Sequence, residues 1–184
     1  MAMPRGPGPA SSAAAVRNVT GRIMSTDGIE VAATQTTAYV RVRGRATFKL
    51  APAFKDYVQN EITQGRQGVL VDMFDCCSLD STFAGTITSL TLQCRKSGKG
   101  CLKLFNVPAH VRGILDTLGL APILEIVQPL DVDSSAFQQL ESASTGKVEV
   151  ARLMFDAHET LAELNEKNAL EFKNVLDQLR SKLQ

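Results

Sequence analysis

The stretch from Val69 to Leu92 constrains the fold more than any other part of the chain. Val69 to Phe74 is a short, mostly apolar run of the length expected for a buried strand. A polar turn follows and ends in Asp80-Ser81-Thr82. From Phe83 onward the apolar spacing takes the period of a helix. A buried strand that turns into a helix is typical of an α/β sheet, where functional residues gather at the strand ends.

Ser81, in the first turn of the expected helix, is therefore the first candidate for a functional residue. The same turn also has a purely structural interpretation. Asp80 and Ser81 both belong to the residue types that favour the N-cap of a helix, and a cap needs no further function. The local pattern leaves both interpretations open.

Strands and helices alternate over residues 28–128. Two strands are expected at Ile29 to Ala32 and at Tyr39 to Arg43, with Gly44 ending the second. The later elements are a helix from Pro52 to Gly65, the strand and helix described above, a strand at Leu102 to Phe105, a helix ending at Gly119 and a strand at Pro122 to Val127. This order predicts an α/β fold with a mixed, mostly parallel sheet.

The segments on either side of this domain differ in composition. Residues 1–27 are rich in Pro, Gly, Ala and Ser, which predicts a flexible N-terminal tail. Residues 129–146 form a linker in which Asp133 could cap a short helix that holds Phe137 and Leu140.

Residues 147–184 carry helical apolar stripes that fail between Leu164 and Asn168, where Asn165 can cap a new helix. We expect a helical hairpin or one long kinked helix that packs on the sheet domain or on itself. A coiled-coil homodimer through this C-terminal helical segment is the alternative.

Composition excludes several classes of protein. The 184 residues have a net charge of +1, no Trp and 5% aromatic residues, so nothing favours nucleic-acid binding. No apolar run reaches the length of a membrane span. The cysteines do not have zinc-site spacing and are expected as free thiols in a reducing cytoplasm: Cys76, Cys77, Cys94 and Cys101. We expect neither a metal nor a cofactor.

An enzyme is also not expected. A serine nucleophile elbow needs Gly two residues to each side, whereas Ser81 has Leu79 and Phe83 there. The histidines that could act as a base are His110, interpreted as a surface or capping residue, and His158, interpreted as solvated in the C-terminal segment. The chain also lacks a GxxxxGK[ST] phosphate-binding loop.

Two stretches carry a resemblance to a known family. Val69-Leu70-Val71-Asp72 leads to the turn Leu79-Asp80-Ser81-Thr82-Phe83-Ala84-Gly85, and Leu102-Lys103-Leu104-Phe105-Asn106-Val107 leads to a helix that stops at Gly119-Leu120. These stretches and the order of elements resemble the STAS family, the fold of bacterial anti-sigma factor antagonists. The resemblance covers about Ile29 to Gln128, and the C-terminal helical segment lies outside it.

The resemblance implies a cytoplasmic regulatory protein that binds an anti-sigma factor serine kinase and so controls sigma-factor-dependent transcription. The family's regulatory serine directly follows the Asp of the turn, which corresponds to Ser81 as the phosphorylation site. Phe83 stands where many members have Gly, and we expect its bulk at the surface beside Ser81. The expected partner-binding residues are Asp80, Ser81, Thr82, Phe83 and Gly85. The alternative function is a non-switching STAS scaffold whose C-terminal helices mediate assembly.

Overall fold

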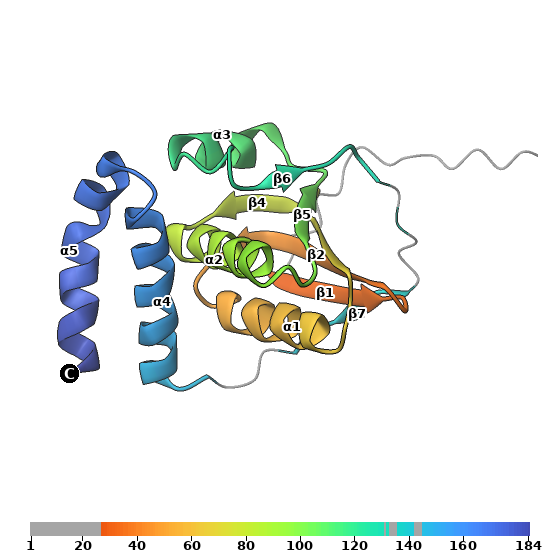
Figure 1. Cartoon of the computed structure of the whole chain (residues 1–184), viewed down its shortest axis with the longest axis horizontal. Coiled ribbons are helices and arrows are strands. Elements are labelled where there is room, and N and C mark those ends of the chain that lie inside the picture. The colour runs from red at the N-terminus through yellow and green to blue at the C-terminus, as the bar shows by residue number, and fades with distance from the viewer. Residues whose placement is uncertain (1–26, 131, 133–135, 142–144) are drawn as a thin grey trace, which may run out of the picture.

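The computed structural model describes residues 27–130, 132, 136–141 and 145–184. Figure 1 shows a mixed sheet with α1 and α2 on one face, and α4 and α5 as a layer at one end. The elements in chain order are β1 (Gly28–Ala33), β2 (Thr37–Ala46), α1 (Ala51–Thr63), β3 (Gly68–Asp72), β4 (Cys76–Leu79), α2 (Ser81–Ser97), β5 (Leu102–Phe105), α3 (Ala109–Thr117), β6 (Glu125–Ile126), β7 (Gln138–Gln139), α4 (Lys147–Ala162) and α5 (Glu166–Leu183).

The described strands form a sheet in the order β6-β5-β3-β2-β1-β7, and β4 pairs with the far part of β2. The β1–β2 pair is an antiparallel hairpin, whereas β2–β3, β3–β5 and β5–β6 are parallel. The expected α/β fold with a mixed, mostly parallel sheet and C-terminal helices is confirmed. Its parallel strands all direct their carboxyl ends toward the side where the helices begin.

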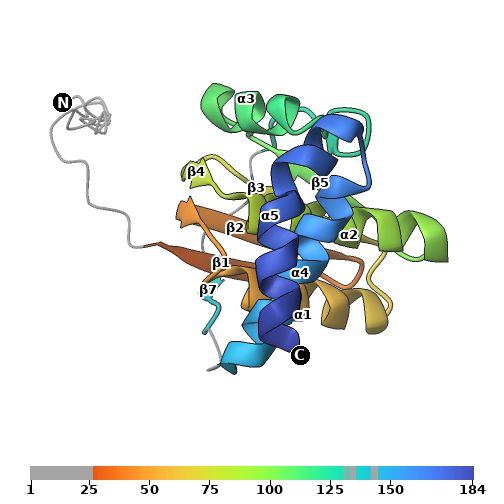
Figure 2. The same ribbon diagram turned by 90° about the vertical axis from the view of Figure 1, so that its left-hand side faces the viewer.

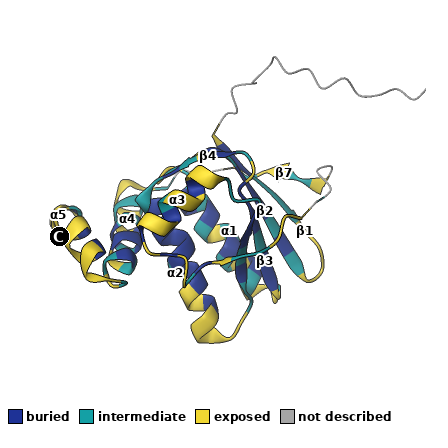
Figure 3. Cartoon of the chain, turned by 90° about the horizontal axis from the view of Figure 1, so that it is seen from above, coloured by how far each residue is buried: buried dark blue, intermediate teal, exposed yellow. Residues whose placement is uncertain are grey.

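Alternation along the strands places one face of the sheet in the core. Val40 and Val42 of β2 and Val71 of β3 are fully buried on the face that α1 and α2 cover. Phe54 of α1 and Phe83 of α2 meet above it, with ring centroids 4.9 Å apart. Figure 3 shows this buried interior between the sheet and the two helices. The packing of these two tilted rings fixes the position of α2 and therefore of Ser81 at its first turn.

On the opposite face, Asp72 at the end of β3 organises the neighbouring loops. Its carboxylate pairs with Arg41 Nε at 3.1 Å and accepts hydrogen bonds from the Asn106 side chain and the Phe74 backbone N–H. Asp72 is 4% exposed, so partners on both oxygens are needed to keep a buried carboxylate stable.

Three local expectations were wrong. Residues 76–79 form the short strand β4 where a turn was expected, because β2 does not end at Gly44 but continues to Ala46 and offers β4 an edge. Gly44 has φ of +67° and marks a shift in register, which suits glycine and lets β2 change partner from β3 to β4. The last expected strand shortens to β6, Glu125–Ile126.

The linker also differs from expectation. Phe137 precedes a short strand, β7, that pairs antiparallel with β1 through Gln138 and Gln139, so the expected short helix with Phe137 and Leu140 is wrong. The edge of β1 supplies free backbone partners that a short polar segment can satisfy without a helix. Asp133, residues 142–144 and residues 1–26 of the expected tail lie outside the described residues.

The C-terminal segment is a hairpin of two helices. Asn165 is the N-cap of α5, and its side-chain oxygen accepts a hydrogen bond from the Asn168 N–H at 2.9 Å. In Figures 1 and 2, α4 lies against the sheet domain and α5 lies on the outer side of α4. The C-terminal segment is therefore a hairpin and not one long kinked helix. Its inner helix, α4, reaches the N-terminal end of α2.

Candidate functional site

Asp80 builds the N-terminal end of α2. One carboxylate oxygen accepts the Phe83 N–H at 2.8 Å as an N-cap, and the other accepts the Phe48 N–H at 2.7 Å. A single side chain therefore begins α2 and ties it to the turn that precedes α1. Ser81 follows as the first helical residue, at the end of the helix where backbone N–H groups have no partner within the helix. The local prediction of a cap at Asp80 is confirmed.

The hydroxyl of Ser81 is paired with a histidine from the C-terminal hairpin. Ser81 Oγ lies 2.9 Å from His158 Nε2, and His158 Nδ1 lies 2.7 Å from the carbonyl oxygen of Met154. A carbonyl oxygen can only accept, so Nδ1 carries the hydrogen. In the neutral imidazole Nε2 is then an acceptor, and the Ser81 hydroxyl donates to it. The contact joins the first turn of α2 to the C-terminal half of α4.

Gly85, one turn further along α2, lies directly beneath α4. A Cβ placed at Gly85 would overlap the backbone carbonyl and the Cβ of Ala157. The backbones of the two helices approach closely here because neither side chain is larger than a methyl group. Ser81 and Gly85 therefore form, with His158 and Ala157, one continuous contact between α2 and α4.

Thr82 and Phe83, two further expected site residues, are buried. Thr82 is 3% exposed, and Phe83 is fully buried against Phe54 in the core. The expectation that Phe83 adds bulk to the surface beside Ser81 is therefore wrong. Its ring turns inward because the third residue of α2 faces the sheet. Whether Asp80, Thr82, Phe83 and Gly85 contribute to binding a partner stays a prediction.

His158 is the functional candidate that sequence reasoning misplaced. The expected solvated residue is 4% exposed and its ring also packs edge-on against Phe172 of α5, with centroids 5.1 Å apart. The sequence does contain a signal, because His158 follows Met154 by four residues and precedes Leu161 by three on the apolar stripe of α4. His110 matches its interpretation as an exposed residue near a helix start, and its Nε2 lies 2.9 Å from the Cys76 carbonyl oxygen.

The cysteines near the site are free. Cys76 of β4 is buried, and its burial raises the pKa of the thiol to about 11, whereas Cys77 is exposed. Within the described residues, no group of three or more His, Cys, Asp or Glu side chains is placed to hold a metal ion. No helix in the described part of the chain is both long and apolar enough to cross a membrane.

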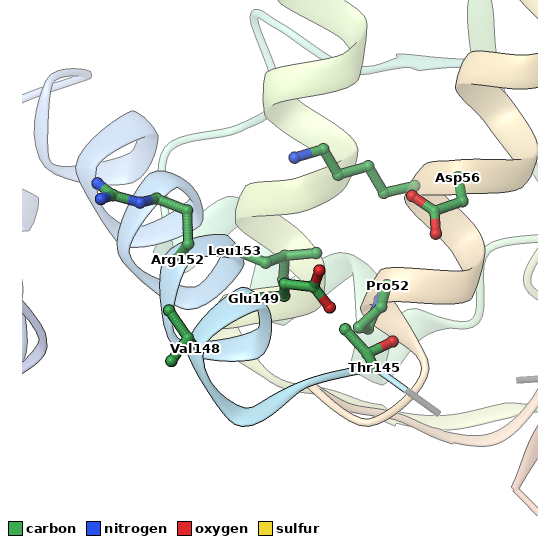
Figure 4. Close-up of a pocket in the computed structure, with 8 residues that line it drawn as sticks. Pro52, Asp56, Thr145, Val148, Glu149, Arg152 and Leu153 are labelled. Atoms are coloured by element: carbon green, nitrogen blue, oxygen red, sulfur yellow. The ribbon is translucent and has the colours of Figure 1, made fainter. Parts of the chain in front are cut away.

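A separate cleft lies beside the hairpin. It has a volume of about 560 Å³ and separates the N-terminal part of α1 from the N-terminal part of α4. Figure 4 shows Pro52 and Asp56 on one side and Val148, Glu149 and Arg152 on the other. Its charged side chains have both signs and are largely at the surface, which gives the cleft no selective chemistry of its own. The cleft separates α4 from α1 at this end, whereas α4 packs directly against α2.

Comparison with solved structures finds proteins that are similar to part of this chain. Solved structures similar to it include the anti-sigma factor antagonist SpoIIAA in its unphosphorylated form, with 17% identity, a TM-score of 0.49 and coverage of 56% of this chain and 89% of that one. An anti-sigma factor antagonist from Mycobacterium paratuberculosis has 14% identity, a TM-score of 0.48 and coverage of 55% and 85%.

The curated protein sequences contain no match to this chain. A family model described as "Mlab, STAS domain" matches residues 29–128, which is more than half of the 184 residues. The matched range contains the sheet from β1 to β6, the Asp80 cap and Ser81, and it ends before β7 and the hairpin that covers Ser81. The chain belongs to the STAS domain family.

Proposed function

We propose that this chain is an anti-sigma factor antagonist-like regulatory protein that binds an anti-sigma factor serine kinase through the N-terminal end of α2. Phosphorylation of Ser81 switches this binding off and so controls sigma-factor-dependent transcription. The observation that carries the proposal is the position of Ser81, which is the first residue of α2 and has its hydroxyl in a contact with another helix.

The physical basis of the switch is local. A phosphate adds about −1.5 to −2 charges at a hydroxyl that was neutral. The N–H groups and the dipole of the first turn of α2 favour an anion, so the domain itself tolerates the group. A helix packed against Ser81 does not, because a 2.9 Å contact leaves no room for a phosphate between the two side chains. The charge and the size of the phosphate therefore weaken the binding of any helix that covers Ser81.

The first test is modification of Ser81. The full chain is incubated with an anti-sigma factor serine kinase, ATP and Mg²⁺, and its phosphopeptides are identified by mass spectrometry. We expect phosphate on Ser81, its loss in Ser81→Ala, and its retention in the matched control Ser89→Ala, which lies two helical turns further along α2. Phosphate that persists unchanged in Ser81→Ala would rule out this site.

The second test is binding. Ser81→Asp places a charge at the same position, and we expect it to weaken binding to the kinase by about a hundredfold, the effect of a few kcal/mol. Ser81→Ala lacks the charge and keeps the binding. Circular dichroism of both variants checks that the fold is intact. Equal affinity of Ser81→Asp and the unmodified chain would exclude the switch.

A non-switching scaffold is the second candidate, and the hairpin favours it. Because His158 and Ala157 of α4 cover Ser81 and Gly85, a chain in which this contact never opens could not be phosphorylated there. Its C-terminal helices would then serve assembly. Absence of phosphate on Ser81 together with stable oligomers would support the scaffold over the switch.

A further inference from the structure

We propose that α2 carries a helix-docking surface, formed by Ser81, Gly85 and Ser89, and that the α4–α5 hairpin is its resident occupant. A protein partner reaches this surface by displacing the hairpin and placing a helix of its own there. The inference rests on the function proposed above, which locates the partner at this end of α2, and it adds how access to that site is controlled.

The surface has the spacing of one helical stripe. Ser81, Gly85 and Ser89 follow one another at intervals of four residues and so lie on one side of α2. Ser89 lies beside Leu153 and Ala157 of α4, around a small gap of about 10 Å³ between the helices. All three positions are small, so a helix can approach the α2 backbone closely.

The contact between α2 and α4 combines polar groups with apolar side chains of the core, among them Leu90 and Leu153. Phe83 and Ile87 of α2 are fully buried, and Phe83 packs against Phe54 of α1, whereas Leu90 of α2 lies beside Leu153 of α4. The stripe itself presents two hydroxyl groups and the backbone of Gly85 to α4, and the Ser81 hydroxyl is hydrogen-bonded to His158. Interfaces of this composition resemble those between separable domains.

The two helices of the hairpin also contact each other, although their buried Leu153, Leu161 and Phe172 belong to the same apolar core as the sheet domain. His158 packs against Phe172 of α5, and the Arg180 guanidinium of α5 lies 5.6 Å from the ring centre of Phe155 of α4. Leu161 of α4 is fully buried. Contacts between α4 and α5 remain when the hairpin leaves α2, so the two helices can move as one unit.

A second anchor holds the hairpin at its turn. Asn168 Nδ2 donates to the Leu118 carbonyl oxygen at 2.9 Å, and Lys167 Nζ donates to the Thr117 carbonyl oxygen at 3.2 Å. These bonds reach the C-terminal end of α3 and do not involve α2. At the other end of α4 the cleft beside Pro52 and Val148 leaves the seam with α1 open. Release of α2 therefore leaves the turn attached to α3.

The resident helix defines the chemistry of the partner. The partner supplies an amphipathic helix with a small residue opposite Gly85 and a hydrogen-bond acceptor opposite Ser81, as Ala157 and His158 do in the free chain. The tethered α4 has a high effective concentration at the surface, so a partner must exceed it in affinity or act on a chain that has opened.

Hydrogen exchange on the unmodified full chain tests whether the hairpin opens. We expect amides of α4 and of the Ser81–Gly85 segment to exchange through a shared opening at least about tenfold faster than those of β2 and β3. If α4 amides exchange at the same slow rate as the sheet, the hairpin leaves only when the whole domain unfolds, and the inference is overturned.

A peptide competition tests whether the uncovered surface accepts a helix. The probe is a fluorescent peptide of residues 145–164. Ala157→Leu adds bulk to the hairpin at its closest approach to Gly85 and leaves α2 unchanged. We expect this full-length variant to bind the peptide at least about tenfold more tightly than the unmodified chain, which keeps its surface occupied.

Ala169→Leu is the matched control, since Ala169 is exposed on α5 and the same substitution there leaves the peptide excluded. A peptide that itself carries Ala157→Leu is expected not to bind. If the folded Ala157→Leu chain binds the peptide no better than the unmodified chain, the surface is not a docking site. Should Ala157→Leu fail to fold, the exchange rates of the unmodified chain decide.

Neither experiment contains a kinase, so each separates this inference from the proposed function. A hairpin that opens and exchanges with the peptide supports the inference even if no kinase modifies Ser81, a result that would remove the proposed function alone. A kinase that phosphorylates Ser81 while α4 exchanges no faster than the sheet would overturn the inference and leave the proposed function standing.

Discussion

Ser81 and His158 illustrate what a single contact does in this protein. The imidazole is nearly fully buried, yet both of its nitrogens have partners, Ser81 on one side and the Met154 carbonyl on the other. A buried polar group without a partner costs roughly 1–3 kcal/mol, so each residue of the pair makes the burial of the other tolerable. The pair therefore contributes to stability as well as covering the proposed site.

A double-mutant cycle on Ser81→Ala and His158→Ala measures this contribution. We expect a coupling free energy of about 0.5–1.5 kcal/mol from urea unfolding, the range of one buried neutral hydrogen bond. His158→Ala alone is expected to cost more, because it also removes the contact with Phe172. A coupling of zero would mean that the two side chains do not interact in solution.

Cys76 and Cys77 are neighbours in the chain, but they differ in burial and are therefore expected to differ in reactivity. Burial raises the pKa of the Cys76 thiol to about 11, so the reactive thiolate is scarce at pH 8 in the folded chain and grows only as the pH approaches that value. We expect Cys77, which is exposed, to react with a thiol reagent first, and Cys76 to react only after unfolding. Cys77→Ser should remove the fastest phase. Rapid labelling of Cys76 in the folded Cys77→Ser chain would contradict its burial.

The residues of the site were predictable only as far as they are local. Asp80 and Ser81 follow from cap preferences and from the change in apolar period, both of which lie within a few residues. The contact between Ser81 and His158 spans 77 positions, and no local pattern specifies which helix face meets which. Phe83 was misplaced for a related reason, since the orientation of the first turn of α2 is set by the ring of Phe54.

At the scale of elements, two glycines in helices have opposite roles. Gly85 of α2 lies against Ala157 of α4, whereas a Cβ at Gly113 of α3 would meet open space. In both helices, glycine loses more conformational entropy on folding than alanine would. The packing around each position decides whether replacing it is favourable.

Gly113→Ala is expected to raise the free energy of unfolding by about 0.4–1 kcal/mol, because it restricts the unfolded chain without a clash. Gly85→Ala is expected to lower it by roughly 1–3 kcal/mol, since the methyl group forces α4 away from α2. Urea unfolding of both variants measures whether the free energy of unfolding rises for Gly113→Ala and falls for Gly85→Ala. An increase in stability for Gly85→Ala would show that α4 does not approach α2 closely in solution.

The elements themselves were largely predictable, and the exceptions share a cause. Long apolar-periodic segments such as α2 and α5 carry their own signal, and so does the β1–β2 hairpin. β7 is made of two glutamines, and β4 contains two cysteines and a serine, so neither has an apolar alternation of its own. Each becomes a strand because a neighbouring edge, β1 or the end of β2, offers backbone hydrogen bonds.

At the scale of the whole molecule, the hairpin uses the apolar stripes that suggested a coiled coil. Leu153 and Leu161 of α4 and Phe172 and Leu179 of α5 are buried within the chain. Among the described residues of the hairpin, the exposed large apolar side chains are Val148 and Leu170, at separate places on α4 and α5. Two isolated side chains do not form the continuous seam that a coiled-coil dimer needs.

We therefore expect the chain to be a monomer at micromolar concentration, and light scattering after size-exclusion chromatography measures this directly. Leu170→Glu places a charge at the most exposed apolar position of α5 and should leave the mass unchanged. If the chain is instead a dimer that Leu170→Glu dissociates, the outer face of α5 is an assembly surface. That outcome would favour the scaffold over the switch, because α5 would then bind a second copy while α4 keeps Ser81 covered.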